Sequence, residues 1–233
     1  MIYLTGDTHG GYDSQKLYKR NFKEGWELTR SDYLIILGDF GYIFDYRGQN
    51  KKERYHLNEL NKKPWTTLFL DGNHENHKRL MEEYPVTENW NGGKVQFIRE
   101  NIIHLMRGNI YKIDGMKLFV MGGALSIDKL YRTPYVSWCP EEIPSKKEMD
   151  YGLEQLEQNG NQVDYVLTHT APESILYQLV KPIAGMDDPT GRYLEHIKET
   201  VKFKKWYFGH LHFDNFVDDT YRAMYNNICK LGE

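Results

Sequence analysis

The amino-acid sequence predicts an α/β fold, and three observations carry this prediction. Short apolar runs rich in β-branched and aromatic residues alternate with helical segments over residues 1–84, which is the order expected of β-α-β units. From residue 94 the runs become shorter, and Asp-Gly joins two of them, which indicates antiparallel pairing. Several runs also end in Gly-Asp or Gly-Asn. In α/β sheets, ligands bind beyond the carboxyl ends of parallel strands, so these strand ends can converge on one crevice.

The first part of the chain alternates buried strands with helices. Strands are expected at residues 2–5, 32–37 and 66–70. Helices are expected over residues 13–23, 49–62 and 76–84. In the turn after the third strand, Gly72 lets the backbone bend sharply and approach a ligand.

The middle of the chain predicts short strands and one long loop. The strands are residues 95–98, 102–105, 110–113 and 117–121, with a hairpin turn at Asp114-Gly115. Residues 127–148 contain three prolines and show little periodicity. We interpret them as an ordered loop, which is either a lid over a functional site or a long surface excursion.

The last part of the chain returns to alternating helices and strands. Ser145 is a plausible N-cap with Glu148 as its capping-box partner, for a helix that Asn159-Gly160 ends. The remaining elements are a strand at 163–167, a helix from about residue 173, a loop through Pro182 and 187–189, a helix over 190–202, a strand at 206–208 and a hairpin of residues 213–216 and 221–225. No internal repeat or linker interrupts this order, so we expect a single domain over residues 1–233.

The composition indicates a globular protein without a basic surface. A chain of 233 residues can bury a sizeable core without cross-links, and we interpret Cys139 and Cys229 as structural thiols. The net charge is −3 and the basic residues are dispersed, so a nucleic-acid partner is possible but not indicated. The first strand follows Met1 directly and no apolar run approaches membrane-spanning length. We therefore expect a cytoplasmic protein without a signal peptide or a membrane partner.

Side chains with ligand or acid-base chemistry gather at the predicted strand ends. They are two carboxylates, one amide and five imidazoles: Asp7, Asp39, Asn73, His9, His74, His169, His210 and His212. Any one of them alone fits an ordinary turn or a hydrogen-bonded histidine, but five of nine histidines at strand ends is not a random placement. Oxygen and nitrogen donors without a thiolate suit Mn, Fe, Zn, Ni or Mg. The set is too large for one tetrahedral ion. With one bridging carboxylate it divides between two ions, as in sites for displacement at phosphorus.

The order of these residues resembles the five-block signature of calcineurin-like metallophosphoesterases, most closely that of small bacterial-type members. The blocks are Gly6-Asp7-Thr8-His9-Gly10, Gly38-Asp39, Gly72-Asn73-His74-Glu75, His169 and Gly209-His210-Leu211-His212. The resemblance spans residues 6–212 and implies a four-layer α/β sandwich, in which helices flank two mixed β-sheets. It also implies metal ligands: Asp7, His9 and His212 for one metal, Asn73, His169 and His210 for the other, and Asp39 as the bridge.

The same resemblance implies an enzyme with two divalent cations, drawn from Mn, Fe, Zn, Ni or Mg with Mn favoured. A metal-bridging hydroxide would attack the phosphorus of a small or accessible phosphate mono- or diester. His74 would act as the general acid on the departing oxygen, and both Asn73 and His74 would contact the substrate.

The sequence also departs from the protein-phosphatase branch of that family. After Gly38-Asp39 that branch carries Val-Asp-Arg-Gly, whereas residues 40–43 of this chain are Phe-Gly-Tyr-Ile. The arginine that grips the phosphate and the aspartate that orients the general acid are therefore missing. Asp45 and Asp71 are candidates to orient His74. Arg132 is a candidate to reach the substrate, although a solvated surface arginine is the expectation.

Two other functions fit the sequence. A nuclease or cyclic-nucleotide phosphodiesterase uses the same metal chemistry, and the lack of a basic face weighs against polynucleotides but not against nucleotides. A metal-binding scaffold without catalysis is the other alternative. A scaffold would be expected to have lost ligands, whereas every ligand position and His74 are filled. The leading hypothesis is therefore a dinuclear metal-dependent phosphoesterase.

Overall fold

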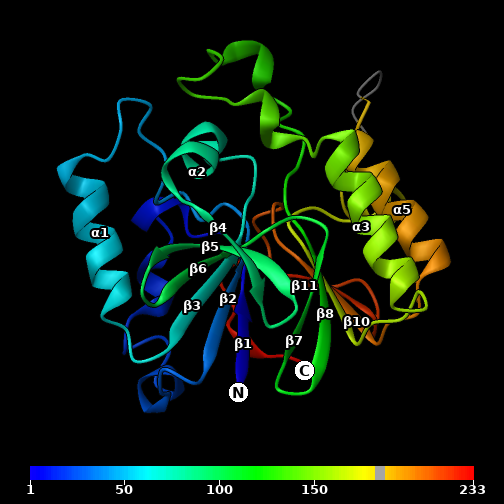
Figure 1. Cartoon of the computed structure of the whole chain (residues 1–233), viewed down its shortest axis with the longest axis horizontal. Helices are drawn as coiled ribbons and strands as arrows, with labels where there is room; N and C mark the ends of the chain where they lie inside the picture. Colours follow the sequence, from blue (N-terminus) through cyan, green and yellow to red (C-terminus); the bar gives the residue numbers. More distant parts are fainter. Residues whose placement is uncertain (182–186) are drawn as a thin grey trace.

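Two mixed β-sheets packed face to face, with helices on their outer sides, form the core of the protein (Figure 1). The computed structural model describes residues 1–181 and 187–233. The first sheet consists of β1 (Ile2–Thr5), β2 (Tyr33–Leu37), β3 (Thr66–Leu70), β4 (Val86–Trp90), β5 (Gly93–Arg99), β6 (Ile102–Leu105) and β13 (Cys229–Lys230). The second consists of β7 (Asn109–Ile113), β8 (Met116–Met121), β9 (Tyr165–Thr168), β10 (Lys205–Phe208), β11 (Asn215–Phe216) and β12 (Tyr221–Ala223).

The centre of each sheet is parallel and its edges are antiparallel. The first sheet has the order β13-β1-β2-β3-β6-β5-β4, in which β1, β2, β3 and β6 run parallel. The second has the order β11-β12-β10-β9-β8-β7, in which β8, β9, β10 and β12 run parallel. The carboxyl ends of the two parallel centres meet, since the His169 ring contacts the Leu37 carbonyl oxygen and the backbone N–H of His210 donates to Asp7. Polar residues from both sheets therefore reach one place.

Three apolar layers confirm the predicted four-layer arrangement. The middle layer fills the space between the sheets, and the strands contribute to it in alternation: Ile35 and Leu37 of β2 belong to it, whereas Leu34 and Ile36 belong to an outer layer. Strands buried on both faces appear in a sequence as continuous apolar runs, which is why the sequence identified them. The helices that cover the sheets are α1 (Lys51–Asn61), α2 (His77–Glu83), α3 (Lys146–Gln158), α4 (Glu173–Leu179) and α5 (Pro189–Thr200).

The expected capping box of α3 is present. The Ser145 side chain accepts from the backbone N–H of Glu148, and the Glu148 carboxylate accepts from Ser145. Asn159 caps the other end and Gly160 follows with φ +69°. The hairpin at Asp114-Gly115 is also confirmed, because β7 and β8 pair antiparallel across it.

The helix expected over residues 13–23 is wrong. The segment forms only a short 3₁₀ turn, Ser14–Leu17, and a second 3₁₀ turn, Glu24–Glu27, follows it. Lys16 is buried, and its ammonium donates to the carbonyl oxygens of Gly6, Asp7 and Tyr225. These contacts tie the segment to the strand end at residue 6, so tertiary contacts override helical propensity here.

Two edge strands were missed, and β2, β9 and β11 begin one or two residues later than expected. β4 is mostly exposed and polar, although the Asn91-Gly92 turn that follows it, with φ +50° and +94°, is a hairpin signal that would have identified it. β13 is two residues long and has no such signal. β9 begins at Tyr165, and the predicted loop at Pro182 lies outside the described residues.

The segment between β8 and α3 contains only two 3₁₀ turns, Lys129–Tyr131 and Pro140–Glu142. In Figure 1 this green segment stands above the ends of the strands. It contributes residues to the candidate site, which decides against a mere surface excursion. Within the described ranges, no helix has the length and apolar character needed to span a bilayer.

Candidate active site

The strand ends bring the candidate ligands together in an unusual backbone conformation. Asp7 follows β1 and Asp39 follows β2, and both are almost fully buried. His9, Asp39, His210 and His212 have φ values between 43° and 68°. Left-handed φ values in residues other than glycine cost on the order of 1 kcal/mol each and cluster at functional sites. The concentration of such strain here indicates a site that the surrounding fold holds in place.

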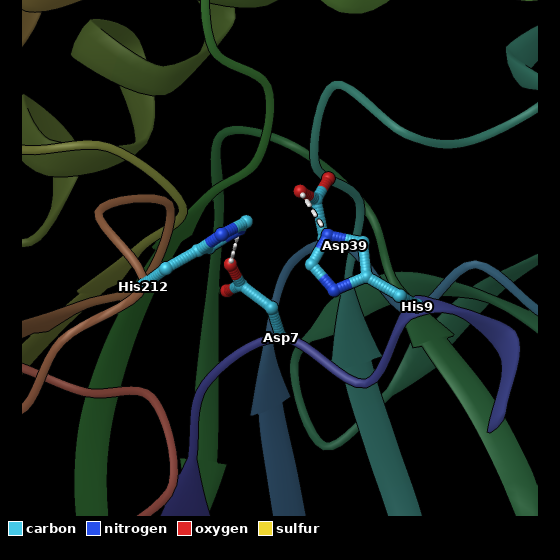
Figure 2. Close-up of side chains that lie close together, drawn as sticks. All are labelled: Asp7, His9, Asp39 and His212. Carbon is cyan, nitrogen blue, oxygen red and sulfur yellow. Dashed lines mark ion pairs between the residues drawn. The ribbon is translucent and has the colours of Figure 1, made fainter. Parts of the chain in front are cut away.

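Four of the candidates form one cluster with the geometry of a cation site (Figure 2). Asp7, His9, Asp39 and His212 each offer a ligand atom, and these atoms lie within 4.8 Å of one another. The Nε2 atom of His212 lies 3.0 Å from Asp7 Oδ2, and that of His9 lies 3.2 Å from Asp39 Oδ2. Neither carboxylate oxygen has a hydrogen-bond partner among the described residues, although both are buried. Leaving a buried carboxylate oxygen without a hydrogen bond costs on the order of a few kcal/mol, so a cation fits this cluster.

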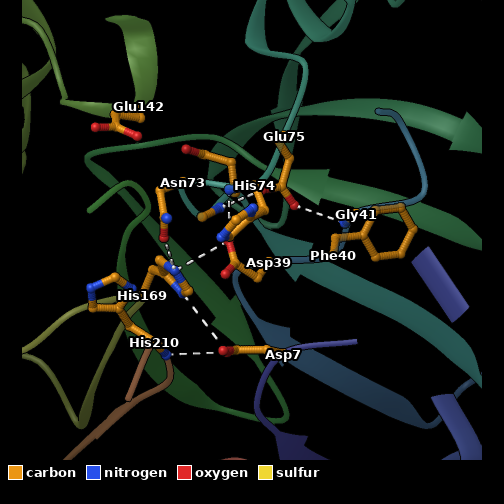
Figure 3. A network of polar contacts seen from close by, with 12 residues as sticks. Asp7, Asp39, Phe40, Gly41, Asn73, His74, Glu75, Glu142, His169 and His210 are labelled. Carbon is orange, nitrogen blue, oxygen red and sulfur yellow. Dashed lines mark hydrogen bonds and ion pairs between the residues drawn. The ribbon is translucent and has the colours of Figure 1, made fainter. Parts of the chain in front are cut away.

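A second group lies on the other side of Asp39 (Figure 3). The Nε2 atom of the fully buried His169 lies 3.0 Å from Asn73 Oδ1 and 3.3 Å from Asp39 Oδ1. Its Nδ1 atom lies 2.8 Å from the Leu37 carbonyl oxygen, which selects the tautomer with the proton on Nδ1. In this tautomer Nε2 presents a lone pair beside two oxygen acceptors, an arrangement that suits a cation. The ring of His210 lies 5.0 Å from that of His169.

Negative charge governs the ionisation of two imidazoles of the site, those of His169 and His9. Burial lowers the pKa of His169, but the neighbouring Asp39 and Asp7 carboxylates outweigh it and raise the pKa to about 10. Burial likewise lowers the pKa of His9, while its contact with Asp39 and the charges of Asp39 and Asp7 raise it to about 9. The same negative charge that favours protons on these two histidines would favour a metal cation, which would displace those protons on binding.

Asp13 orients His9, a role that the sequence analysis missed. Its Oδ2 atom lies 2.6 Å from His9 Nδ1 and accepts from it, which leaves Nε2 to face Asp39. Carboxylates that hold metal-ligating imidazoles in this way are common partners of metal ligands. The spacing of four residues between His9 and Asp13 was the available signal.

A buried polar chain orients Asn73. Its Nδ2 atom donates to Ser126 Oγ at 3.0 Å, and Ser126 donates from Oγ and from its backbone N–H to Glu142 at 2.5 and 2.9 Å. Glu142 is fully buried. Because the amide nitrogen is engaged by Ser126, the amide oxygen faces His169. The roles of Ser126 and Glu142 were not predicted, because both residues are far from Asn73 along the chain and no local sequence pattern links them to it.

Glycine is required where the turn after β3 passes the site. A Cβ atom on Gly72 would lie 2.2 Å from Asp39 Oδ1 and 2.7 Å from His169 Nε2. Glu75 holds this turn to the one after β2, since its carboxylate accepts from the backbone N–H groups of Gly72 and Gly41. Burial first, and then the charge of Asp39, raise the pKa of Glu75 to about 8.

His74 stands apart from the cation cluster. Its backbone N–H donates to Asp39 Oδ1 at 2.8 Å, and its ring nitrogens lie 3.3 and 3.4 Å from the two Nη atoms of Arg132. Burial lowers its pKa, and the charge of Arg132 lowers it further while Asp39 opposes both. Asp71 and Asp45 do not orient this ring, so that hypothesis is wrong: Asp71 pairs with Arg107 and Asp45 with Asn50.

Two hollows meet at His74. One, of about 460 Å³, contains Asp39, Asn73 and the histidines of the β10 turn, and its wall is largely apolar. The other, of about 600 Å³, contains His9 and is lined by the rings of Tyr12, Tyr42, Phe44 and Tyr46. A third cavity, of about 750 Å³, lies beside β13 and includes none of the strand-end histidines. His74 therefore has open space on two sides.

Arg132 lies in this site, contrary to the expectation of a solvated surface arginine. Its side chain is only 19% exposed and it lines the 460 Å³ hollow. The interpretation failed because the position depends on the path of residues 122–145, which carry no periodic signal. The two cysteines, in contrast, are buried free thiols as expected.

Comparison with known proteins gives one family match and several similar folds. The family model described as calcineurin-like phosphoesterase matches residues 1–214. One solved crystal structure has a TM-score of 0.53 and 12% identity, covering 96% of this chain and 88% of that chain, and it supports the fold alone. No curated protein matches the sequence.

Two further solved structures are more distant. Phosphopantetheinyl hydrolase (PptH) from Mycobacterium tuberculosis has a TM-score of 0.43 and 16% identity, covering 96% of this chain and 87% of that chain. TT1561 of Thermus thermophilus has a TM-score of 0.47 and 10% identity with the same coverage, 96% and 87%. Both TM-scores are below 0.5, so neither likeness supports a conclusion about this chain.

Proposed function

This chain belongs to the calcineurin-like phosphoesterase family and is a metal-dependent phosphoric ester hydrolase; from that premise we propose that it hydrolyses a phosphate mono- or diester with two divalent cations and with His74 as the general acid. One ion would be held by Asp7, His9 and His212, the other by Asn73, His169 and His210, and both by Asp39. We also propose that residues 1–233 act as one domain, because both sheets contribute ligands to this one site.

The observation that supports this proposal best is the position of Asp39 between two groups of donors. Its Oδ2 atom faces His9 and its Oδ1 atom lies 3.3 Å from His169. One carboxylate thus faces a donor group with each oxygen, as a bridging ligand must. When bound, two such ions lower the pKa of a water molecule and neutralise charge on the phosphoryl oxygens.

The position of His74 supports its proposed role as the general acid. It lines both hollows, and its backbone bond to Asp39 holds it next to the ligands while its ring nitrogens remain outside the cation cluster. An imidazole held in this way can give a proton to an oxygen that leaves toward either hollow. Asn73, on the adjacent position, presents its amide to the same 460 Å³ hollow and can contact the phosphoryl group.

The test is hydrolysis of p-nitrophenyl phosphate and bis(p-nitrophenyl) phosphate by metal-stripped protein supplied with Mn, Fe, Zn, Ni or Mg. We expect Mn²⁺ to support the highest rate. We expect His74→Ala to lower kcat about 10²- to 10⁴-fold, the usual contribution of a general acid, while the metal content stays unchanged.

His196→Ala is the matched control, because His196 is exposed on α5 and should leave the rate unchanged. Turnover by His74→Ala equal to that of the unaltered protein would contradict the role of His74. Absence of bound cation together with no hydrolysis of either ester would instead favour the non-catalytic scaffold.

A nucleotide phosphodiesterase is the second candidate, favoured by the aromatic hollow. Exposed rings of Tyr12, Phe44 and Tyr46 line it, together with Arg47 and Lys52. Aromatic faces stack on nucleobases, and the cations offset the negative charge of a nucleotide. A panel containing 2′,3′-cyclic and 3′,5′-cyclic nucleotides decides between this candidate and a monoesterase.

A further inference from the structure

Arg132 presents one edge of its guanidinium to the reaction site. The Nη1 atom lies 3.3 Å from His74 Nδ1, and Nη2 lies 3.4 Å from His74 Nε2. A neutral imidazole has one nitrogen that accepts and one that donates, and a guanidinium only donates. At most one of these two contacts is therefore a hydrogen bond. The edge of the guanidinium that faces the site lacks the anionic partner that it would bind best.

The opposite side of the same guanidinium is held by the loop that carries it. Its Nε atom lies 2.8 Å from Asp128 Oδ1, and Nη1 also donates to the Ser137 carbonyl oxygen at 3.3 Å. Asp128 is half exposed, and an exposed pair of this kind contributes little to stability. The ion pair therefore orients the Arg132 side chain, but it contributes too little stability to be the reason why an arginine occupies this position.

The loop itself is anchored at the site. Glu142 binds Ser126 at one end of the loop, and Arg107 donates to the Glu141 carbonyl oxygen at 2.9 Å. These contacts hold both ends of the loop above the ends of the strands, and the bonds of Arg132 to Asp128 and Ser137 set its position between them. A planar donor pair in a fixed place binds an oxyanion with little loss of conformational entropy.

The other residues that line the hollow indicate which anion Arg132 would bind. Asp39, Asn73 and His74 line the same 460 Å³ space as Arg132. Arg132 and Lys181 are the cationic residues that line it, and Arg132 is the one in contact with His74. A phosphoryl group bound at the proposed metal ligands would lie within this space.

We propose that Arg132 is a phosphate-binding residue, whose Nη edge binds a non-bridging oxygen of the substrate's phosphoryl group. The inference rests on the proposed function of the site. Residues 40–43, in the turn after β2, include no arginine, so the positive charge on the phosphoryl group's side of the site would come from the loop between β8 and α3. On substrate entry, the contact of Arg132 with His74 is exchanged for a bond to the phosphoryl oxygen, which leaves the His74 ring free to face the departing oxygen.

The first test is the binding of inorganic phosphate to the Mn²⁺-loaded protein by titration calorimetry. Arg132→Ala is expected to raise the Kd for phosphate about 10- to 100-fold, as for the loss of a hydrogen bond to a charged group. Arg132→Lys keeps the charge but loses the planar fork, so we expect a smaller increase. Lys129→Ala removes a cation from the same loop that lines neither hollow, and its Kd should be unchanged.

The second measurement is the steady-state hydrolysis of p-nitrophenyl phosphate by the same variants, with metal content measured for each. A substrate contact predicts a lower kcat/KM for Arg132→Ala, partial recovery in Arg132→Lys and full metal content in both. Loss of metal in Arg132→Ala would show a structural role and overturn the inference. If Arg132→Ala folds poorly, Arg132→Lys decides alone, and an unchanged Kd in it together with an unchanged kcat/KM overturns the inference.

The failure of this inference can be distinguished from the failure of the proposed function. If Arg132→Ala binds phosphate and hydrolyses the ester as the unaltered protein does, Arg132 has no such role and the phosphoesterase function stands. If the unaltered protein hydrolyses no ester with any metal, the proposed function fails, and the phosphate titration still decides whether Arg132 binds the anion.

Discussion

Asn73 illustrates how the chemistry of one residue depends on others that are remote in sequence. An amide can present its oxygen or its nitrogen to a neighbour, and only the oxygen is a ligand for a cation. Ser126 accepts from the nitrogen, and the buried Glu142 in turn accepts from Ser126. This chain of hydrogen bonds fixes the amide with its oxygen toward His169 and thereby makes Asn73 a candidate ligand.

A prediction at the residue scale concerns Glu142→Gln. The glutamine amide would point an N–H group at donors of Ser126, so the chain would rearrange and Asn73 would lose its orientation. We expect the affinity for Mn²⁺ to fall about 10- to 100-fold, which is typical when a residue behind a ligand is replaced. Competition with a metal-binding dye measures it. Glu141→Gln is the control, because the Glu141 side chain contacts Tyr135 outside the chain of hydrogen bonds; equal affinities in both variants would refute the prediction.

At the scale of elements, the loop between β8 and α3 combines a helix cap at its end with residues that lie at the site. Its last residue, Ser145, caps α3, and its residues 126, 132 and 142 lie at the site. The cap is a local interaction that the sequence pattern predicts. The path of the rest of the loop follows from contacts such as that between Arg107 and the Glu141 carbonyl oxygen.

Ser145→Ala is predicted to lower the free energy of unfolding by about 1 kcal/mol, the typical cost of losing a helix cap. The reason is that the N–H of Glu148 loses its side-chain acceptor and the Glu148 carboxylate loses the bond that it accepts from Ser145 Oγ. Urea denaturation followed by circular dichroism gives the value. Lys147→Ala, an exposed substitution in the same turn, should change it by less than about 0.5 kcal/mol. Coincident unfolding curves for the two variants would show that the cap contributes nothing.

At the scale of the whole molecule, the site joins the two sheets. Asp7, Asp39 and Asn73 follow strands of the first sheet, whereas His169, His210 and His212 follow strands of the second. In the described structure polar contacts join the two groups, for example from His169 to the Leu37 carbonyl oxygen and to Asn73, and from His210 N–H to Asp7. A cation held by ligands from both sheets would add a direct link between them.

Metal binding is therefore predicted to stabilise the entire fold. At a free Mn²⁺ concentration of 100 times Kd, mass action adds about 2.7 kcal/mol, which for a chain of this size raises Tm by about 5–10 °C. Differential scanning calorimetry with Mn²⁺ and with EDTA measures the shift. Asp39→Asn should abolish most of it, because this residue faces both donor groups. A Tm that is the same with and without Mn²⁺ would argue against a shared metal centre.

The sequence predicted the strands well where one stretch of chain carries the whole signal. The buried runs of β1, β2 and β3 are apolar on both faces, and the hairpin of β7 and β8 has its turn dipeptide directly between the two runs that it joins. The helix expected over residues 13–23 failed because burial of the Lys16 ammonium against three carbonyl groups, one of them on Tyr225, outweighs a weak local preference.

The candidate ligands could be named from the sequence because each lies within a few residues of the end of a strand, and parallel strands of one sheet end at the same edge. Only the structure shows that the edges of the two sheets meet. The assignment of the ligands to two metals stays a prediction. The residues that orient these side chains could not be named in the same way. Asn73 and Ser126 are 53 positions apart, and Arg132 and His74 are 58 positions apart. Contacts over such separations depend on how the loops cross above the sheets, and no periodic pattern in a single segment encodes that path.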